Sequence, residues 1–204
     1  DHEVNVVNIM SEAPAKILAA ASRIYLDKGL PGLTMRAVAE VLGQSATALY
    51  RHYADKEALV IALVDEGYRR FGEYQLRAIE SKTAQERMRA AGRAYVDFAL
   101  EHPDYYRLMF ITPPTLGEVD LPEHVRHRAR GVFQTLADRI RDCIAADLFP
   151  RTLDPDLLAR SIWALSHGLV SLYLAGKWQG SEAQFRAFFS QSHEWLARGY
   201  LTES

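Results

Sequence analysis

The chain has 204 residues, of which 49% are hydrophobic and 25% are charged, and its formal net charge is −2 at pH 7. This apolar content is sufficient to bury a core, which excludes a disordered chain, and the length permits one domain or two. Residues 14–57 hold six Lys or Arg against four Asp or Glu, a surplus that permits a polyanionic partner without establishing one.

The hydrophobic pattern predicts helices throughout the chain. Nowhere do more than a few residues alternate between apolar and polar as in a strand, whereas apolar residues recur at the 3.6-residue period of a helix. We therefore predict an all-α protein of about nine helices. Residues 1–9 look unlike the rest and Met10 is a candidate for the native start, so these residues do not enter the fold prediction.

The first four helices are predicted from the residues at their ends. Pro14 suits a first helical turn, and Gly29 and Gly43 suit helix ends. Thr34 and Ser45 can each accept a hydrogen bond from a free N–H group at a helix start. The expected spans are 14–29, 34–43, 45 to about 53, and 55 to about 80.

Five further helices follow from similar signals. Capping boxes, in which the two ends of a four-residue pair satisfy free N–H groups, and prolines at first-turn positions mark their starts. These signals are Thr83…Glu86, Ser181…Gln184, Leu121-Pro122 and Asp154-Pro155, with a break at His102-Pro103 and an end at Pro113-Pro114. We expect the Pro- and Gly-rich segment from Thr112 to Asp120 to be mobile.

The second and third helices form a candidate helix-turn-helix motif. The tight turn Gly43-Gln44-Ser45 joins them, and in the third helix only Leu49 and Tyr53, four residues apart, face inward. The outward residues are Ala46, Thr47, Ala48, Tyr50, Arg51 and His52. Small side chains followed by long hydrogen-bonding ones suit a helix that enters the DNA major groove. The helix starts at Thr34 and Asp55 offer free N–H groups to flanking phosphates, and Lys56 adds positive charge.

Residues 14–63 closely resemble the DNA-binding domain of the TetR family of transcriptional regulators. The stretches that carry the resemblance are "LTMRAVAEVLG" and "SATALYRHYADKEAL". It implies that Arg36, Thr47, Ala48 and His52 meet bases, and that Thr34, Ser45, Tyr50 and Lys56 mainly contact phosphates. Gln44 and Arg51 complete the predicted DNA-binding set. Because two of the three small positions are alanines, base reading there is expected to be mostly apolar.

The resemblance also implies an N-terminal three-helix domain at residues 10–56, joined by a long helix to a ligand-sensing and dimerising helical bundle at residues 57–204. In the bundle, "SIWALSHGLVSLYLAG" resembles a Trp then His-Gly signature found in a subset of these domains. This helix has a small-residue face, which lets another helix come close, either a symmetry mate or the final helix. The small-residue face consists of Ala164, Gly168, Ser171 and Ala175.

A second face of the same helix carries rings and is a candidate for a ligand cavity. Core packing is the alternative interpretation of each of its residues, although His167 needs a polar partner in the protein or in a ligand. The predicted ligand set is Tyr95, Tyr106, Met109, Phe110, Trp163 and His167. Such a lining suits a small, largely apolar effector.

Other functional classes lack their motifs. No Glu has a His three residues later, and the chain has no Gly-x-Ser-x-Gly, no His-Glu-x-x-His and no phosphate-binding glycine loop. We therefore predict no enzyme activity and no cofactor. His124 and His127 are interpreted as part of a solvated face and not as metal ligands, and the single Cys143 as a buried small hydrophobe.

The stretch Ser161 to Gly176 is too short and too interrupted by polar residues to span a bilayer, so we expect no membrane association and a cytoplasmic protein. The leading functional prediction is a ligand-responsive homodimer, paired through its last two helices, that acts as a repressor and releases a palindromic operator when it binds its effector. The alternative is a helical protein-interaction module that has lost DNA binding.

Overall fold

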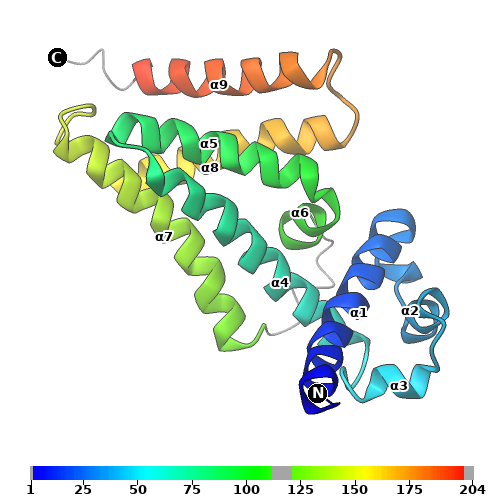
Figure 1. The fold of residues 1–204 in the computed structure, drawn as a ribbon. Coiled ribbons are helices and arrows are strands. Elements are labelled where there is room, and N and C mark those ends of the chain that lie inside the picture. Colours follow the sequence, from blue (N-terminus) through cyan, green and yellow to red (C-terminus); the bar gives the residue numbers. More distant parts are fainter. Residues whose placement is uncertain (1, 112–120, 200–204) are drawn as a thin grey trace. The chain divides into compact units, whose positions relative to one another are not determined.

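The computed structural model describes residues 2–111 and 121–199, with side chains described from residue 13 onward. The described residues form nine α-helices and one short 3-10 helix, with no strand among them, which confirms the all-α prediction (Figure 1). The helices are α1 His2–Gly32, α2 Met35–Leu42, α3 Ala46–Tyr50, α4 Lys56–Arg77, α5 Ala84–Glu101, α6 Pro103–Phe110, α7 Glu123–Ala145, α8 Pro155–Leu174 and α9 Glu182–Gly199, with η1 at Ala78–Glu80. The segment expected to be mobile lies outside the described residues.

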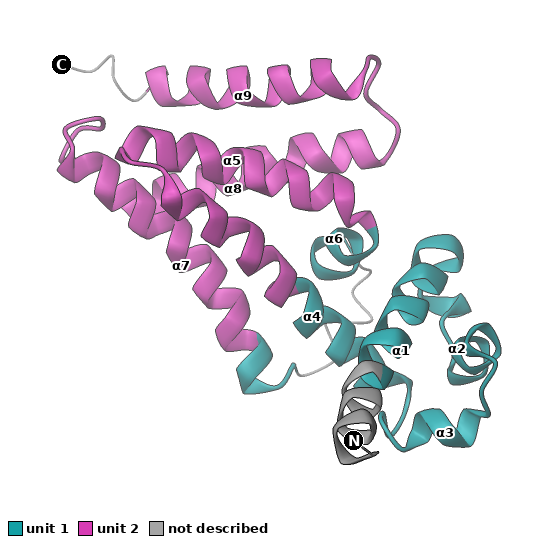
Figure 2. Cartoon of the chain, viewed as in Figure 1, with its two compact units in different colours: residues 1–67, 104–125 teal, residues 68–103, 126–204 magenta. Residues whose placement is uncertain are grey.

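The chain divides into two compact units (Figure 2). Unit 1 comprises residues 1–67 and 104–125, and unit 2 comprises residues 68–103 and 126–204. These units are defined by packing, so the functional division at residue 56 stays a prediction. α4 contributes residues to both units.

The helix ends follow the sequence signals closely. α1 runs through Pro14 from His2, so the helix begins earlier than expected, but it breaks at Gly29, whose φ is 65°. Such a φ favours glycine because it has no Cβ. α3 ends at Tyr50 rather than near Tyr53, and α4 gives way to η1 at Ala78.

Unit 2 is a helical bundle. α5 packs against α8 and α9, and α8 packs against α9 (Figure 1). A buried cluster joins α7 and α8, consisting of Ala137, Ile140, Leu158, Ala159 and Ile162. Cys143 is buried as predicted, where burial raises the pKa of its thiol, and the thiol donates to the carbonyl of Ala84 at 3.7 Å.

The bundle also contains a buried arginine that the sequence pattern did not reveal. Arg139 of α7 is only 5% exposed, and its guanidinium donates to the backbone carbonyl of Gln75 at 2.6 Å and to the side-chain oxygen of Gln75 at 2.5 Å. Gln75 lies in the last turn of α4, where carbonyl groups lack intrahelical partners. Arg139 therefore caps the C-terminal end of α4, which places a cation where the helix dipole favours one.

Candidate nucleic-acid interface

The starts of α2 and α3 are capped by the two hydroxyl side chains that were predicted to do so. The N–H of Ala37 donates to Thr34 Oγ1 at 3.1 Å, and the N–H of Ala48 donates to Ser45 Oγ at 3.3 Å. Both hydroxyl oxygens act as acceptors in these bonds, so each keeps its own O–H as a donor. Both residues are exposed, and a DNA phosphate is an acceptor of the required kind.

α3 is anchored by one side chain and presents the others. Leu49 is 0% exposed, whereas Tyr50 is 52% exposed. Tyr53, expected to face inward with Leu49, is half-buried, and its pKa is raised by burial and by the nearby charge of Glu66. The remaining predicted contact residues of this region are exposed or half-buried, namely Gln44, Thr47, Ala48, Arg51 and His52.

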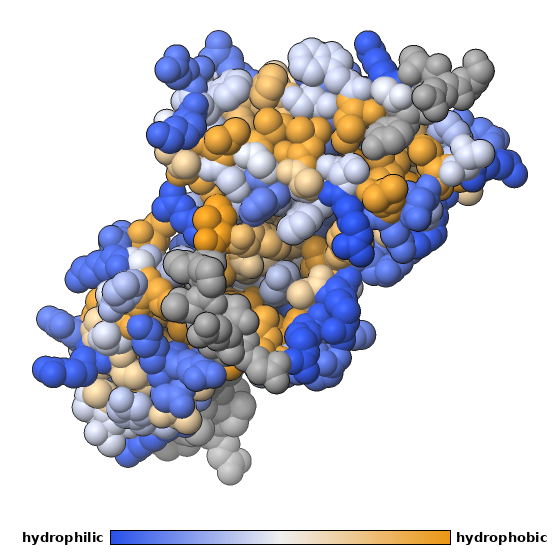
Figure 3. Space-filling model, turned by 180° about the vertical axis from the view of Figure 1, so that it is seen from behind, coloured by the Kyte–Doolittle hydropathy of each residue, from blue (hydrophilic) through white to orange (hydrophobic). Residues whose placement is uncertain are grey.

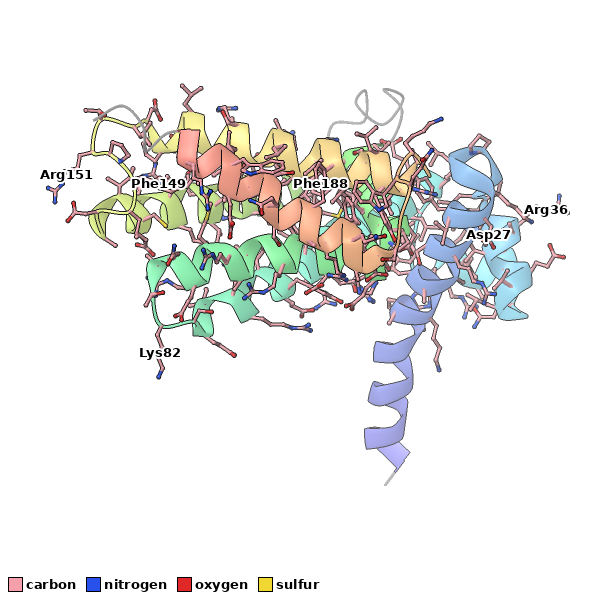
Figure 4. All side chains as sticks on the ribbon, turned by 90° about the horizontal axis from the view of Figure 1, so that it is seen from above. Asp27, Arg36, Lys82, Phe149, Arg151 and Phe188 are labelled. Carbon is pink, nitrogen blue, oxygen red and sulfur yellow. The ribbon has the colours of Figure 1, made fainter. Side chains whose placement is uncertain are left out.

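Arg36 is the second residue of α2, two positions after the Thr34 cap. Its side chain is exposed and extends away from the helices of unit 1 (Figure 4). The adjacent residues Met35 and Val38 are buried, which fixes the face that α2 turns outward. Arg36 is therefore held by a packed helix, as a base-reading side chain needs to be.

Lys56 is predicted to contact DNA, but its side chain is hydrogen-bonded within the protein. Its ammonium group donates to the backbone carbonyl of Leu30 at 2.7 Å, in a part-buried bond. The bond joins residues 26 positions apart, so no local sequence pattern could have indicated it. Asp55 caps the same helix start, where its carboxylate accepts from the N–H of Ala58 at 2.7 Å.

Among the described residues, nothing covers the small-residue face of α8. Ala164, Gly168 and Ala175 are exposed, Ser171 is half-buried, and a Cβ built on Gly168 would meet no atom within 4 Å. α9 packs on another side of α8, so it does not cover this face. The sequence left two candidates for the helix that packs on this face, the final helix and a symmetry mate. Because α9 does not cover the face, a second copy of the chain is the candidate that remains.

Several large apolar side chains of α8 and α9 are also exposed. On α8, Leu157 is 64% exposed and Leu172 is 56% exposed, and Trp195 of α9 is 57% exposed. Apolar residues gather on the face of unit 2 that the space-filling view shows (Figure 3). By length and composition α8 is also the one helix among the described residues that could cross a membrane, but its other side packs in the bundle. An exposed patch of this kind is typical of an association surface.

The predicted ligand-binding residues fall in both units. In unit 2, the rings of Trp163 and His167 stack with centroids 5.6 Å apart, and Tyr95 is buried against Phe71. In unit 1, Tyr106 is buried and contacts the ring of Phe110, and Met109 lies close to Gly67 of α4. A single cavity lined by all six stays a prediction.

His167 has a polar neighbour within its own helix. Its Nε2 lies 3.5 Å from the hydroxyl of Ser171, and burial lowers its pKa. The imidazole therefore favours the neutral form, in which one ring nitrogen donates a hydrogen bond and the other accepts one.

The two histidines that were weighed as metal ligands lie on α7. His124 and His127 are both exposed on α7, as expected for a solvated face. Across residues 2–111 and 121–199, no three His, Cys, Asp or Glu side chains are grouped so that they could hold a metal ion.

Comparison with known proteins gives matches over most of the chain. Residues 17–63 match the family described as bacterial regulatory proteins, tetR family, and residues 88–194 match the tetracyclin repressor-like C-terminal domain. A solved structure of a bacterial regulatory protein in the tetR family from Rhodococcus RHA1 has a TM-score of 0.71 at 22% identity, over 93% of this chain and 97% of that one. At this identity the likeness shows the fold alone.

Two curated relatives have names that describe opposite effects on transcription. The transcriptional activator FasR of Mycolicibacterium smegmatis is 30% identical over 100 residues, which cover 48% of this chain and 46% of FasR. The transcriptional repressor AcnR of Corynebacterium diphtheriae is 38% identical over 58 residues, which cover 28% of this chain and 30% of AcnR. The chain thus spans about half or less of the length of these two relatives. The match to the N-terminal family includes every residue predicted to contact DNA.

Proposed function

The chain belongs to the TetR family of bacterial regulatory proteins, which are DNA-binding transcription regulators, and from this premise we propose that it is a ligand-responsive dimer that binds a palindromic operator. We propose that it acts as a repressor in the cytoplasm and releases its operator when a small, largely apolar effector binds. Because FasR and AcnR are named for opposite effects, this direction needs a direct test.

One observation carries the proposal for DNA recognition. α3 buries Leu49 completely and leaves Thr47 and Tyr50 exposed, and His52 is exposed in the turn that follows. A helix held from below by one apolar anchor, with its polar side chains outward, has the form required of a recognition helix in the major groove. Selection of duplexes from a random pool tests it, because a two-fold protein should enrich a palindrome. A protein-interaction module without DNA binding would enrich nothing.

Arg36 and Tyr50 are expected to contribute to binding in different ways. Arg36→Ala should weaken the selected operator by ~1–3 kcal/mol and relax the preference at one base position, because a base contact is lost. Tyr50→Phe removes only a hydroxyl group, so it should weaken all sequences alike. Affinities for a panel of single-base operator variants distinguish the two results. Arg23→Ala, which removes an exposed arginine from α1 of the same unit, is the control.

Two results would contradict the prediction that Arg36 reads a base. If Arg36→Ala keeps the full base preference while Tyr50→Phe loses it, then Tyr50 reads a base and Arg36 does not. If Arg23→Ala reproduces the effect of Arg36→Ala, then general charge and not base reading explains the loss.

The proposed route from effector to DNA passes through α4. A Cβ at Gly67 of α4 would lie 2.5 Å from the sulfur of Met109 and 3.3 Å from Tyr105, so α6 lies directly against α4 at this point. Leu59 and Leu63, one to two turns earlier in α4, are buried in the same unit as α2 and α3. A displacement of α6 by a ligand is therefore transmitted to the helix that follows the recognition helix.

The effector is expected to lower operator affinity by roughly one to two powers of ten, since coupling free energies of ~1–3 kcal/mol are typical. All three tryptophans, Trp163, Trp178 and Trp195, lie in unit 2, so quenching of intrinsic fluorescence provides a screen of small apolar compounds. By reciprocity, operator DNA must weaken ligand binding by the same factor. A compound that quenches Trp163 and saturates cleanly while operator affinity stays unchanged would contradict the coupling. Trp163→Phe identifies which signal comes from the proposed site.

A further inference from the structure

The Lys56 bond to Leu30 closes a loop of chain at its neck. The loop contains α2, the turn at Gly43 and α3, which together are the whole helix-turn-helix motif. Inside the loop, Leu33, Val38 and Leu49 are each 0% exposed, and α2 packs against α1 as well as α3, so the motif shares its apolar core with α1. At the neck, the charged ammonium group of Lys56 donates a hydrogen bond to the backbone carbonyl of Leu30.

The acceptor is a carbonyl that needs a partner from elsewhere in the chain. Leu30 follows the break at Gly29 and lies in the last turn of α1, where carbonyl groups lack partners within the helix. A backbone carbonyl that is partly shielded from water is stabilised by a hydrogen bond, and a charged donor makes a stronger bond than a neutral one. Lys56 supplies that donor from the first residue of α4.

The two residues of this bond lie close in sequence to the two helix starts predicted to bind phosphates. Thr34, the N-cap of α2, comes four residues after Leu30, and Lys56 is the first residue of α4. The distance between two phosphates on DNA is fixed. The N-termini of α2 and α4 must therefore have a matching separation if both are to contact phosphates while α3 reads the bases. A bond across the neck therefore sets how well phosphate contacts and base contacts form at the same time.

On this basis, which rests on the proposed operator binding, we propose that Lys56 is a positioning residue for sequence recognition. Its ammonium group holds the Leu30 carbonyl and so fixes the spacing of the α2 and α4 N-termini around α3. This role differs from a plain phosphate contact, which adds affinity for every sequence equally.

Salt dependence separates the two roles. A lysine that neutralises one phosphate contributes about 0.9 to the slope of log affinity against log salt, and its removal weakens specific and scrambled DNA alike. Removal of a lysine that positions the motif lowers the ratio of the affinity for specific DNA to the affinity for scrambled DNA. It leaves the salt slope unchanged. Lys56→Met keeps the aliphatic stem and removes the donor. Lys28→Met is the matched control, because Lys28 is an exposed lysine of α1 in the same unit.

The experiment measures the affinity of the full-length wild-type protein and both variants for a duplex selected by the wild-type protein and for a scrambled duplex of equal length, at several salt concentrations. Lys56→Met should weaken the selected duplex about tenfold, the effect of losing a hydrogen bond from a charged donor, and the scrambled duplex far less, with the slope kept. Lys28→Met should keep the ratio. An equal loss on both duplexes with a slope lower by about 0.9 would overturn the positioning role.

Amide hydrogen exchange of the free protein gives a second measurement that does not depend on DNA. Exchange in residues 30–36 should accelerate in Lys56→Met and not in Lys28→Met, because the neck opens more often. Unchanged exchange in Lys56→Met would overturn the inference. A wild-type protein that enriches no duplex would count against the proposed operator binding, and exchange would then decide the role of Lys56 at the neck.

Discussion

Gly168→Leu should convert the protein into monomers and lower operator affinity by about 10²- to 10⁴-fold, the usual gain from attaching two binding modules at once. Gly168 lies among Ala164 and Ala175 on the exposed small-residue face of α8, and a close helix contact there has no room for a leucine. A Cβ built on Gly168 meets no atom within 4 Å in the subunit itself, so we expect the folded monomer to accommodate the substitution. Light scattering and operator titration measure the two effects.

Ala183→Leu is a suitable control for this change, because Ala183 is an exposed small residue of α9 that has no place in the small-residue face. It should stay dimeric. A Gly168→Leu protein that is fully dimeric with normal operator affinity would show that pairing uses another surface. Circular dichroism should show the same helix content in both variants and the wild-type protein.

Leu49→Ala should lower the free energy of unfolding of unit 1 by about 3 kcal/mol, within the range of ~2–5 kcal/mol found for buried leucines. Leu49 is 0% exposed and is the only residue of α3 that is fully buried, so the substitution leaves a cavity beneath the recognition helix. Typical domains have only ~5–15 kcal/mol of stability, so a loss of this size is a large fraction of it. Urea denaturation measures the loss of stability, and hydrogen exchange in residues 33–53 shows whether the loss lies in unit 1.

Leu26→Ala removes the same atoms from α1 at a position that is 39% exposed, and should cost below about 1 kcal/mol. Comparable destabilisation by the two variants would mean that Leu49 is not the anchor of α3. Normal operator affinity in folded Leu49→Ala at low temperature would mean that α3 keeps its position without the leucine.

Most of the fold could be predicted from the sequence because the helix ends are marked by local chemistry. Caps such as Thr34, Ser45 and Asp154 act within three residues of their own position, so a single stretch of sequence contains the whole signal. The inward position of Leu49 followed in the same way from helical spacing. Membership of a family of transcription regulators confirms that the chain is not an enzyme.

The features that could not be predicted join residues far apart in the chain. Lys56 meets Leu30 and Arg139 meets Gln75 across separations of 26 and 64 residues, and no local pattern records such a meeting. Likewise, helical spacing identified Trp163 as a ring beside His167, but the 40% exposure of Trp163 depends on which helices cover α8. Long-range packing, and not local propensity, decides these positions.

The five-residue length of α3 limits how this protein's DNA-reading surface can be used on its own. An isolated peptide shorter than about 12 residues forms little helix in water, because its few hydrogen bonds do not offset the free-energy cost of helix nucleation. A synthetic copy of residues 45–53 should therefore be unstructured and should not discriminate between DNA sequences. Transfer of this specificity to another protein would require grafting the side chains onto a host that already has the same supporting helices.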